Sequence, residues 1–80
     1  MEPVEVSARF DADGAVTPLR FKWRGEEYPV VSTGRRWQGK EGHHVLVLVP
    51  NEMVFELIFQ AAETRWYLKQ PGKNRSNPVG

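Results

Sequence analysis

The chain has 80 residues, of which 40% are hydrophobic and 11% aromatic, and its formal net charge is +1. This length accommodates one domain, and the apolar fraction suffices for a packed core. The absence of cysteine excludes disulfides, thiolate nucleophiles and zinc sites built on thiolates. The apolar runs fall short of the roughly 18 residues that a membrane span needs, and the first residues lack the regions of a signal peptide. We therefore expect a cytoplasmic protein without a membrane segment.

Apolar and polar side chains alternate along the first third of the chain. In VEVSARF, Val4–Phe10, every second residue is apolar, which is typical of a half-buried strand. The turn cluster Asp11–Gly14 ends this strand. The alternation resumes in LRFKWRG, where Leu19, Phe21 and Trp23 are predicted to face the core.

Three further segments follow. EYPVVS is predicted to be a strand at a sheet edge, because Pro29 lacks a backbone donor. The polar segment RRWQGKEG is predicted to be a loop in which glycines supply flexibility. HHVLVLVP is the most apolar and β-branched stretch, so we expect it to be the central strand.

The sequence of residues 52–63 allows two alternative secondary structures, a helix or a strand. Met53, Leu57 and Ala61 have the spacing of a helix, and neither proline nor glycine interrupts them. We favour a strand in MVFELIF because its aromatic alternation is cleaner and a strand and turn precede it. A short helical turn near residues 60–63 then leads into the last predicted strand, TRWYLKQ.

These segments predict an all-β fold: a small, strongly curved antiparallel sheet or barrel of five to six strands. The domain is expected to span residues 1–70, and residues 71–80 have the composition of a flexible tail. The predicted core contains Val6, Phe10, Phe21, Trp23, Val47, Phe55, Leu57 and Trp66.

The sequence resembles a family of short bacterial proteins. The residues that carry the resemblance are Arg9-Phe10, Arg20–Tyr28, Arg36-Trp37 and Phe55–Leu68, which match an R-F-x-W-R-G-x-x-Y…R-W…F-x-L-x-F…W-x-L pattern over residues 4–69. Some relatives occur at the end of, or beside, Y-family DNA polymerases of the lesion-bypass type. The resemblance implies a DNA-repair setting and no catalytic residues.

The chain lacks the residue patterns of most enzymes and metal sites. His43 and His44 are adjacent, so on a strand they point to opposite faces and cannot chelate one ion side by side. None of the three serines lies in a Gly-x-Ser-x-Gly elbow, and the glycine spacing does not form a phosphate loop. Glutamates such as Glu56 are expected to be solvated. We therefore expect a non-enzyme with no catalytic residue, metal or cofactor.

The segment Arg20–Lys40 concentrates six of the eleven basic residues and two of the three tryptophans. Cations beside an aromatic ring that can stack on a base are typical of sequence-tolerant single-strand binders. We therefore predict a binding module that contacts single-stranded nucleic acid or a DNA-repair protein. The alternative is a solvated face on a protein-interaction module that docks a partner at the strand edge of Pro29. The predicted nucleic-acid contacts are Arg20, Lys22, Arg24, Arg35, Arg36 and Trp37.

Overall fold

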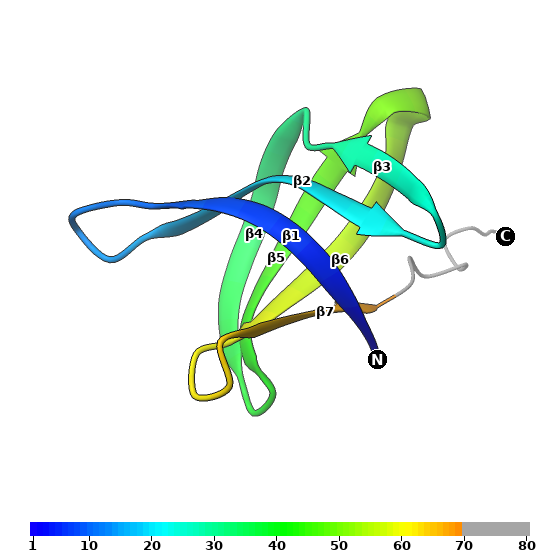
Figure 1. Cartoon of the computed structure of the whole chain (residues 1–80). Helices are drawn as coiled ribbons and strands as arrows, with labels where there is room; N and C mark the ends of the chain where they lie inside the picture. The colour runs from blue at the N-terminus through cyan, green and yellow to red at the C-terminus, as the bar shows by residue number, and fades with distance from the viewer. Residues whose placement is uncertain (70–80) are drawn as a thin grey trace, which may run out of the picture.

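Seven strands of the computed structural model, which describes residues 1–69, form one curled antiparallel sheet (Figure 1). The strand order is β3-β2-β1-β7-β6-β5-β4, so the first and last strands are neighbours. The all-β prediction is confirmed, and the predicted five or six strands are corrected to seven. The expected tail, residues 71–80, lies outside the described residues. The strands are β1 (Glu2–Phe10), β2 (Val16–Trp23), β3 (Glu26–Pro29), β4 (Ser32–Gly39), β5 (Gly42–Val49), β6 (Met53–Gln60) and β7 (Arg65–Lys69).

Residues 53–60 form a strand, as favoured over the helical alternative. A short 3-10 helix, Pro50–Glu52, connects β5 to β6. The helical turn expected near residues 60–63 is instead a non-helical turn. In it Glu63 N donates to Gln60 O at 3.2 Å, and Thr64 N donates to Ala61 O at 3.2 Å.

The segment predicted to be a loop, RRWQGKEG, forms the last five residues of β4, the turn and the first residue of β5, so that prediction is wrong. Only Lys40 and Glu41 form the turn. β4 is a terminal strand and pairs with β5 alone among the described strands, so it does not need the apolar residues of an interior strand. A register shift between Thr33 and Arg36 also interrupts the alternation that would have identified it.

A second irregularity lies in the β1–β2 pair. Ser7 pairs with Arg20, whereas Ala8 pairs with Pro18, so Leu19 is an extra residue on β2. Leu19 is consequently 44% exposed, and Pro18 is buried in its place. The prediction that Leu19 faces the core is therefore wrong, because the bulge reverses the side-chain alternation before Phe21.

The core lies on the inner face of the curled sheet, where β1 and β2 pass in front of β4–β6 (Figure 1). The ring centroids of Phe21 and Phe55 are 5.4 Å apart, and those of Trp23 and Phe55 are 5.2 Å apart. Phe10, predicted to be core, is 61% exposed because it lies at the far end of the β1–β2 hairpin. The buried cluster comprises Phe21, Val45, Val47, Val49, Phe55, Leu57, Trp66 and Leu68.

The curled sheet stays open along one side. β3 pairs only with Arg20–Trp23, which leaves the first half of β2 without a strand on that side. The chain crosses from β3 to β4 at Val30 and Val31, whose N–H groups donate to Leu19 O at 3.0 Å and Leu48 O at 2.7 Å. Beyond this crossing, the part of β2 that β3 does not cover and the terminal strand β4 border an opening of the sheet, which we call its mouth. β3, with its Pro29, lies at a sheet edge as predicted, but the predicted strand EYPVVS continues only to Pro29, since Val30 and Val31 form the crossing to β4.

Candidate ligand-binding pocket at the mouth of the sheet

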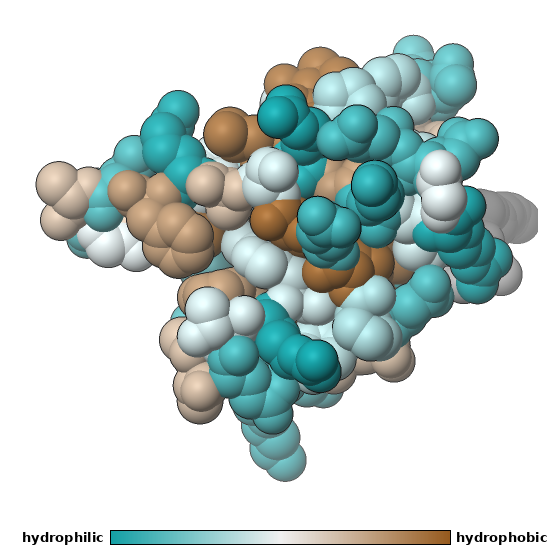
Figure 2. Space-filling view, in the orientation of Figure 1, coloured by the Kyte–Doolittle hydropathy of each residue, from teal (hydrophilic) through white to brown (hydrophobic). Residues whose placement is uncertain are grey.

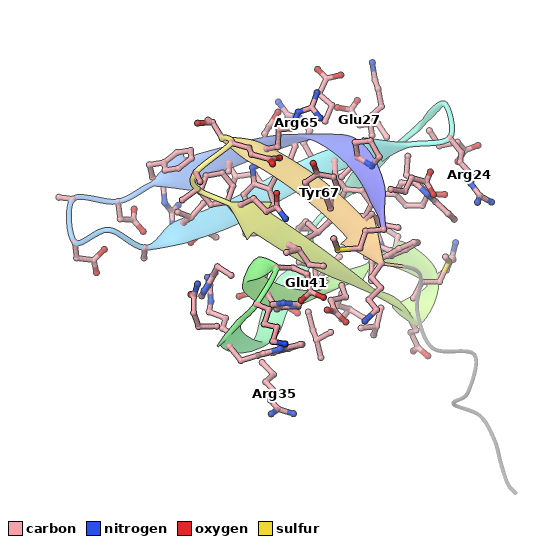
Figure 3. The ribbon with its side chains drawn as sticks, turned by 90° about the horizontal axis from the view of Figure 1, so that it is seen from below. Arg24, Glu27, Arg35, Glu41, Arg65 and Tyr67 are labelled. Atoms are coloured by element: carbon pink, nitrogen blue, oxygen red, sulfur yellow. The ribbon has the colours of Figure 1, made fainter. Side chains whose placement is uncertain are left out.

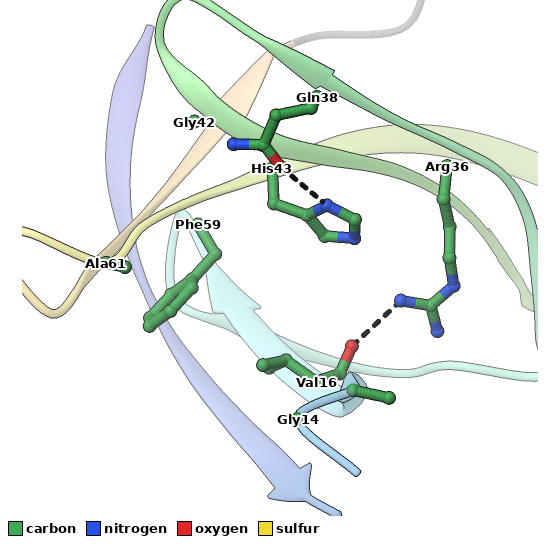
Figure 4. Close-up of a pocket in the computed structure, with 9 residues that line it drawn as sticks. Gly14, Val16, Arg36, Gln38, Gly42, His43, Phe59 and Ala61 are labelled. Carbon is green, nitrogen blue, oxygen red and sulfur yellow. Dashed lines mark hydrogen bonds between the residues drawn. The ribbon is translucent and has the colours of Figure 1, made fainter.

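A pocket of about 530 Å³ opens at this mouth, between the tip of the β1–β2 hairpin and the ends of β4, β5 and β6. Figure 2 shows the surface hollowed between the projecting hairpin at the left and the turns at the bottom. The volume lies within the range of about 300–1,000 Å³ that small-molecule sites occupy. Figure 4 shows Gln38 and His43 together on one wall, Arg36 and Val16 on another, and the ring of Phe59 across from them.

The pairing register explains why these side chains converge. Gln38 pairs with His43, and His43 pairs with Phe59, so the three form one cross-strand row on the inner face. Arg36 pairs with the buried Val45 and belongs to the next row inward. Along this row the inner face changes from apolar at Phe59 on β6 to polar at His43 on β5 and Gln38 on β4, which gives the pocket one apolar and one polar side.

Arg36 is half-buried and carries a charge that no carboxylate of residues 1–69 neutralises. Its Nη1 donates to Val16 O at 2.9 Å, and this is its one hydrogen bond within those residues. No ion pair joins it to any described carboxylate. Val16 lies on the part of β2 that β3 leaves uncovered, so the guanidinium occupies an acceptor that a further strand would otherwise use. Its other N–H groups remain for a ligand, because a guanidinium has five donors.

His43 is the second polar group of the pocket. Its Nδ1 lies 3.3 Å from Gln38 Oε1. Burial, the charge of Arg36 and the proximity of His44 lower the pKa of His43 below its usual 6.5. The lowered pKa favours the neutral ring at pH 7, in which a hydrogen bond to the Gln38 amide oxygen requires the proton on Nδ1. Nε2 is left as an acceptor, and no group of residues 1–69 donates to it.

The lowered pKa of His43 predicts a loss of stability in acid. The unfolded chain takes up a proton on His43 near pH 6.5, whereas the folded chain does so only at lower pH. The free energy of unfolding should therefore decrease as the pH falls through 6.5 toward the lowered pKa. Urea denaturation of the wild type and of His43→Gln at pH 7.5 and 5.5 would isolate this effect. The variant should lose less stability than the wild type, and an equal loss in both proteins would contradict the prediction.

The predicted cations Arg20 and Lys22 of β2, and Arg24 in the turn after β2, are exposed outside the pocket, and carboxylates accompany them. Arg20 Nε lies 3.3 Å from Glu27 Oε2, and Arg24 Nη2 lies 3.8 Å from Glu2 Oε1. Lys22 pairs in register with Glu27 of β3 on one side and with Glu5 of β1 on the other. Their positive charge is thus largely balanced locally, which leaves little net field to attract a phosphate chain.

Arg35 and Trp37, predicted to lie on a flexible loop, instead project from the outer face of β4. The indole of Trp37 stacks on His44 with centroids 5.0 Å apart and planes 18° apart, and Arg35 Cζ lies 5.1 Å from the indole centroid. Figure 3 shows Arg24 at the right of the molecule and Arg35 at the bottom, well apart from each other. The six predicted residues therefore occupy three places: the β2 face, the β4 outer face and, for Arg36 alone, the pocket.

His44 lies on the face opposite His43, as adjacent strand residues must. It is 5% exposed, with Nδ1 2.6 Å from Glu56 Oε2 and Nε2 3.2 Å from Glu41 Oε1. The expectation that Glu56 is solvated is therefore wrong. No group of three His, Cys, Asp or Glu within the described part of the chain is arranged to hold a metal ion. We interpret His44, its partners Glu56 and Glu41, and the stacked Trp37 as a structural cluster that holds the outer face of β4 to β5.

Three pocket residues, Gln38, His43 and Phe59, were not singled out from the sequence as a site. Phe59 could be placed on the core side of its strand from its alternation with Phe55 and Leu57. Its alignment with His43 and Gln38 depends on the register of two hairpins, which the sequence does not specify.

Comparison of the chain with known protein families, curated proteins and solved structures finds no match. Within residues 1–69, no helix has the length and apolar character required to cross a membrane.

Proposed function

We propose that this protein is a non-catalytic binding module for single-stranded nucleic acid, and that the pocket at the mouth of the sheet is its principal contact. One observation carries the proposal: Arg36 presents an unneutralised, half-buried guanidinium in a pocket whose opposite wall is an aromatic ring. Single-strand binders combine these two elements, a cation for the phosphate and an aromatic side chain on which a base stacks.

The surroundings of the pocket support an anionic ligand. No aspartate or glutamate lines it, and the β4–β5 turn beside it adds the exposed cation Lys40. Glu41, the one acidic residue of the β4–β5 hairpin, lies against His44 on the other face. The DNA-repair setting follows only from the resemblance to proteins found beside lesion-bypass polymerases.

The alternative function is docking of a protein partner at an exposed strand edge. β3 and β4 are both terminal strands, and β4 is the longer, so β4 is the better template for an added strand. Backbone pairing with a peptide would depend weakly on salt, whereas a nucleic acid releases counterions on binding. The salt dependence of binding therefore discriminates between the two functions.

The test is a titration of the protein with a short single-stranded oligonucleotide at two or more salt concentrations. Among the described residues, Arg36 is the one basic residue that lines the pocket, Lys40 lies in the adjoining β4–β5 turn, and each phosphate contact contributes about −0.7 to the log–log slope for a single strand. We expect a slope of about −1.4 from these two contacts, with weak affinity. Participation of all five predicted cations would give about −3.5 instead. A flat titration at low salt with folded protein contradicts the proposed function.

A further inference from the structure

Beside the mouth pocket, the β1–β2 hairpin carries an aromatic side chain that the fold leaves uncovered. Phe10 is 61% exposed and is the one exposed aromatic residue among residues 1–69. On the basis of the proposed function, we infer that Phe10 is a second base-stacking residue, so that the site binds two adjacent unstacked nucleotides, one on Phe59 and the next on Phe10. The contact between these two rings, beside the guanidinium of Arg36, carries the inference.

The exposure of Phe10 has no purpose within the core. Val4, Val6 and Ala8 precede it on the same face of β1 and pack against the buried cluster, whereas Phe10 is the next residue in this alternation and lies beyond the cluster. An aromatic ring left in water forgoes the free energy of its burial. A ligand that covers this ring would therefore gain affinity from it.

The hairpin backbone places Phe10 close to the cation of the pocket. Phe10 and Val16 are directly paired, so their Cα atoms are about 4.5–5.5 Å apart. The carbonyl oxygen of Val16 accepts the hydrogen bond from Arg36 Nη1 at 2.9 Å. The guanidinium thus lies against the backbone that faces Phe10, where its other N–H groups can bind the phosphate between a nucleotide on Phe59 and the next one on Phe10.

The angle between the two rings specifies the form of the nucleic acid. The ring centroids of Phe10 and Phe59 are 5.8 Å apart, and their planes are inclined by 70°. Bases stacked on the two rings cannot be parallel to each other, so the strand must be unstacked at this step. A single strand can splay its bases in this way, whereas the bases of a duplex remain stacked on one another.

The charges of the hairpin limit the site to two bases. Arg9 Nε lies 3.0 Å from Asp11 Oδ1, so the charge of Asp11 is balanced locally. Asp13, farther along the turn, accepts a hydrogen bond from Ala15 N at 3.0 Å and has no ion pair within residues 1–69. Its carboxylate would repel a phosphate chain at the tip. We therefore expect the strand to leave the hairpin after Phe10.

The inference is tested with single strands of equal length that are abasic except for zero, one, two or three adjacent thymines, so that the phosphate charge stays constant. Fluorescence anisotropy at one low salt concentration gives the affinities. The first thymine and the second adjacent thymine should each strengthen binding roughly tenfold, and a third should add no more than about twofold. Two thymines separated by several abasic sites should bind within about twofold of one thymine.

The matched protein variant is Phe10→Leu, which keeps an apolar side chain against Phe59 but removes the ring. It should retain the gain from the first thymine and lose the gain from the second. Phe10→Trp, which restores an aromatic ring, should retain both gains. The control Leu19→Ala removes another exposed apolar side chain of the same hairpin and should also retain both.

The outcomes separate this inference from the proposed function. A second adjacent thymine that adds nothing in the wild type, or a second gain that survives in Phe10→Leu, would overturn the inference and leave the proposed function standing. Loss of both gains in Phe10→Leu would show that Phe10 only positions Phe59, which also overturns the inference. Absence of binding of any strand by the folded wild type would overturn the inference and the proposed function together.

Discussion

Phe21→Ala is expected to lower the free energy of unfolding by about 3–5 kcal/mol, the usual cost of truncating a buried aromatic ring. Phe21 is 1% exposed, and its ring contacts Tyr28 at 5.3 Å and Phe55 at 5.4 Å between centroids. The substitution removes a fully buried aromatic side chain of β2 that packs against Phe55 of β6. Small domains have only about 5–15 kcal/mol of stability, so the variant should be barely folded or unfolded at 37 °C.

The control is Leu19→Ala, two residues earlier on the same strand. A regular strand would place Leu19 and Phe21 on one face, whereas the bulge leaves Leu19 44% exposed. This substitution should change stability by less than about 0.5 kcal/mol. Urea denaturation of the two variants tests the bulge: a comparable loss of stability in both would show that Leu19 belongs to the core and that the β1–β2 register is different.

Period-two alternation predicted the strands wherever one face is apolar and the other polar. It identified β1 and β6, and Phe55 and Leu57 were placed in the core because nothing interrupts their alternation. It failed for Leu19, because a bulge adds one residue without any signal in the local composition. Pro18, next to the bulge, is the one residue that could have indicated an irregular strand.

The terminal strand β4 was the largest error, and its cause is physical. Most side chains of this strand are exposed or half-buried, since only one neighbouring strand covers it, so its sequence has the polarity of a loop. The same property puts Arg36 on the inner face beside the pocket, where an interior strand would need an apolar residue. The polar composition that made β4 resemble a loop therefore also supplies a polar side chain of the candidate site.

The sequence showed that basic residues cluster, but their grouping in space depends on the curl of the sheet. Arg20 and Arg36 are 16 positions apart, and the strands that hold them lie near opposite ends of the strand order. One faces outward beside Glu27, and the other faces inward beside His43. Side-chain direction on β4 and the partners on neighbouring strands determine which cation is free to act, and neither can be predicted from spacing alone.

The prediction with the largest effect on binding compares two substitutions that each remove one positive charge. Arg36→Gln should weaken binding of a dT oligonucleotide about 10- to 100-fold, because a hydrogen bond to a charged group contributes about 1.5–3 kcal/mol. Arg20→Gln should change affinity less than about twofold, because Arg20 lies on the outer face and is paired with Glu27. Arg36→Lys should bind with intermediate affinity, since lysine keeps the charge but lacks the planar fork.

The central claim, that the mouth pocket and not the β2 face binds the strand, is tested by measuring these affinities side by side at low salt. Circular dichroism must first show that both glutamine variants retain the wild-type β spectrum. A large loss of affinity for Arg36→Gln with near wild-type affinity for Arg20→Gln is the predicted result. Equal losses for the two variants, or a larger loss for Arg20→Gln, would contradict it and place the binding surface on β2.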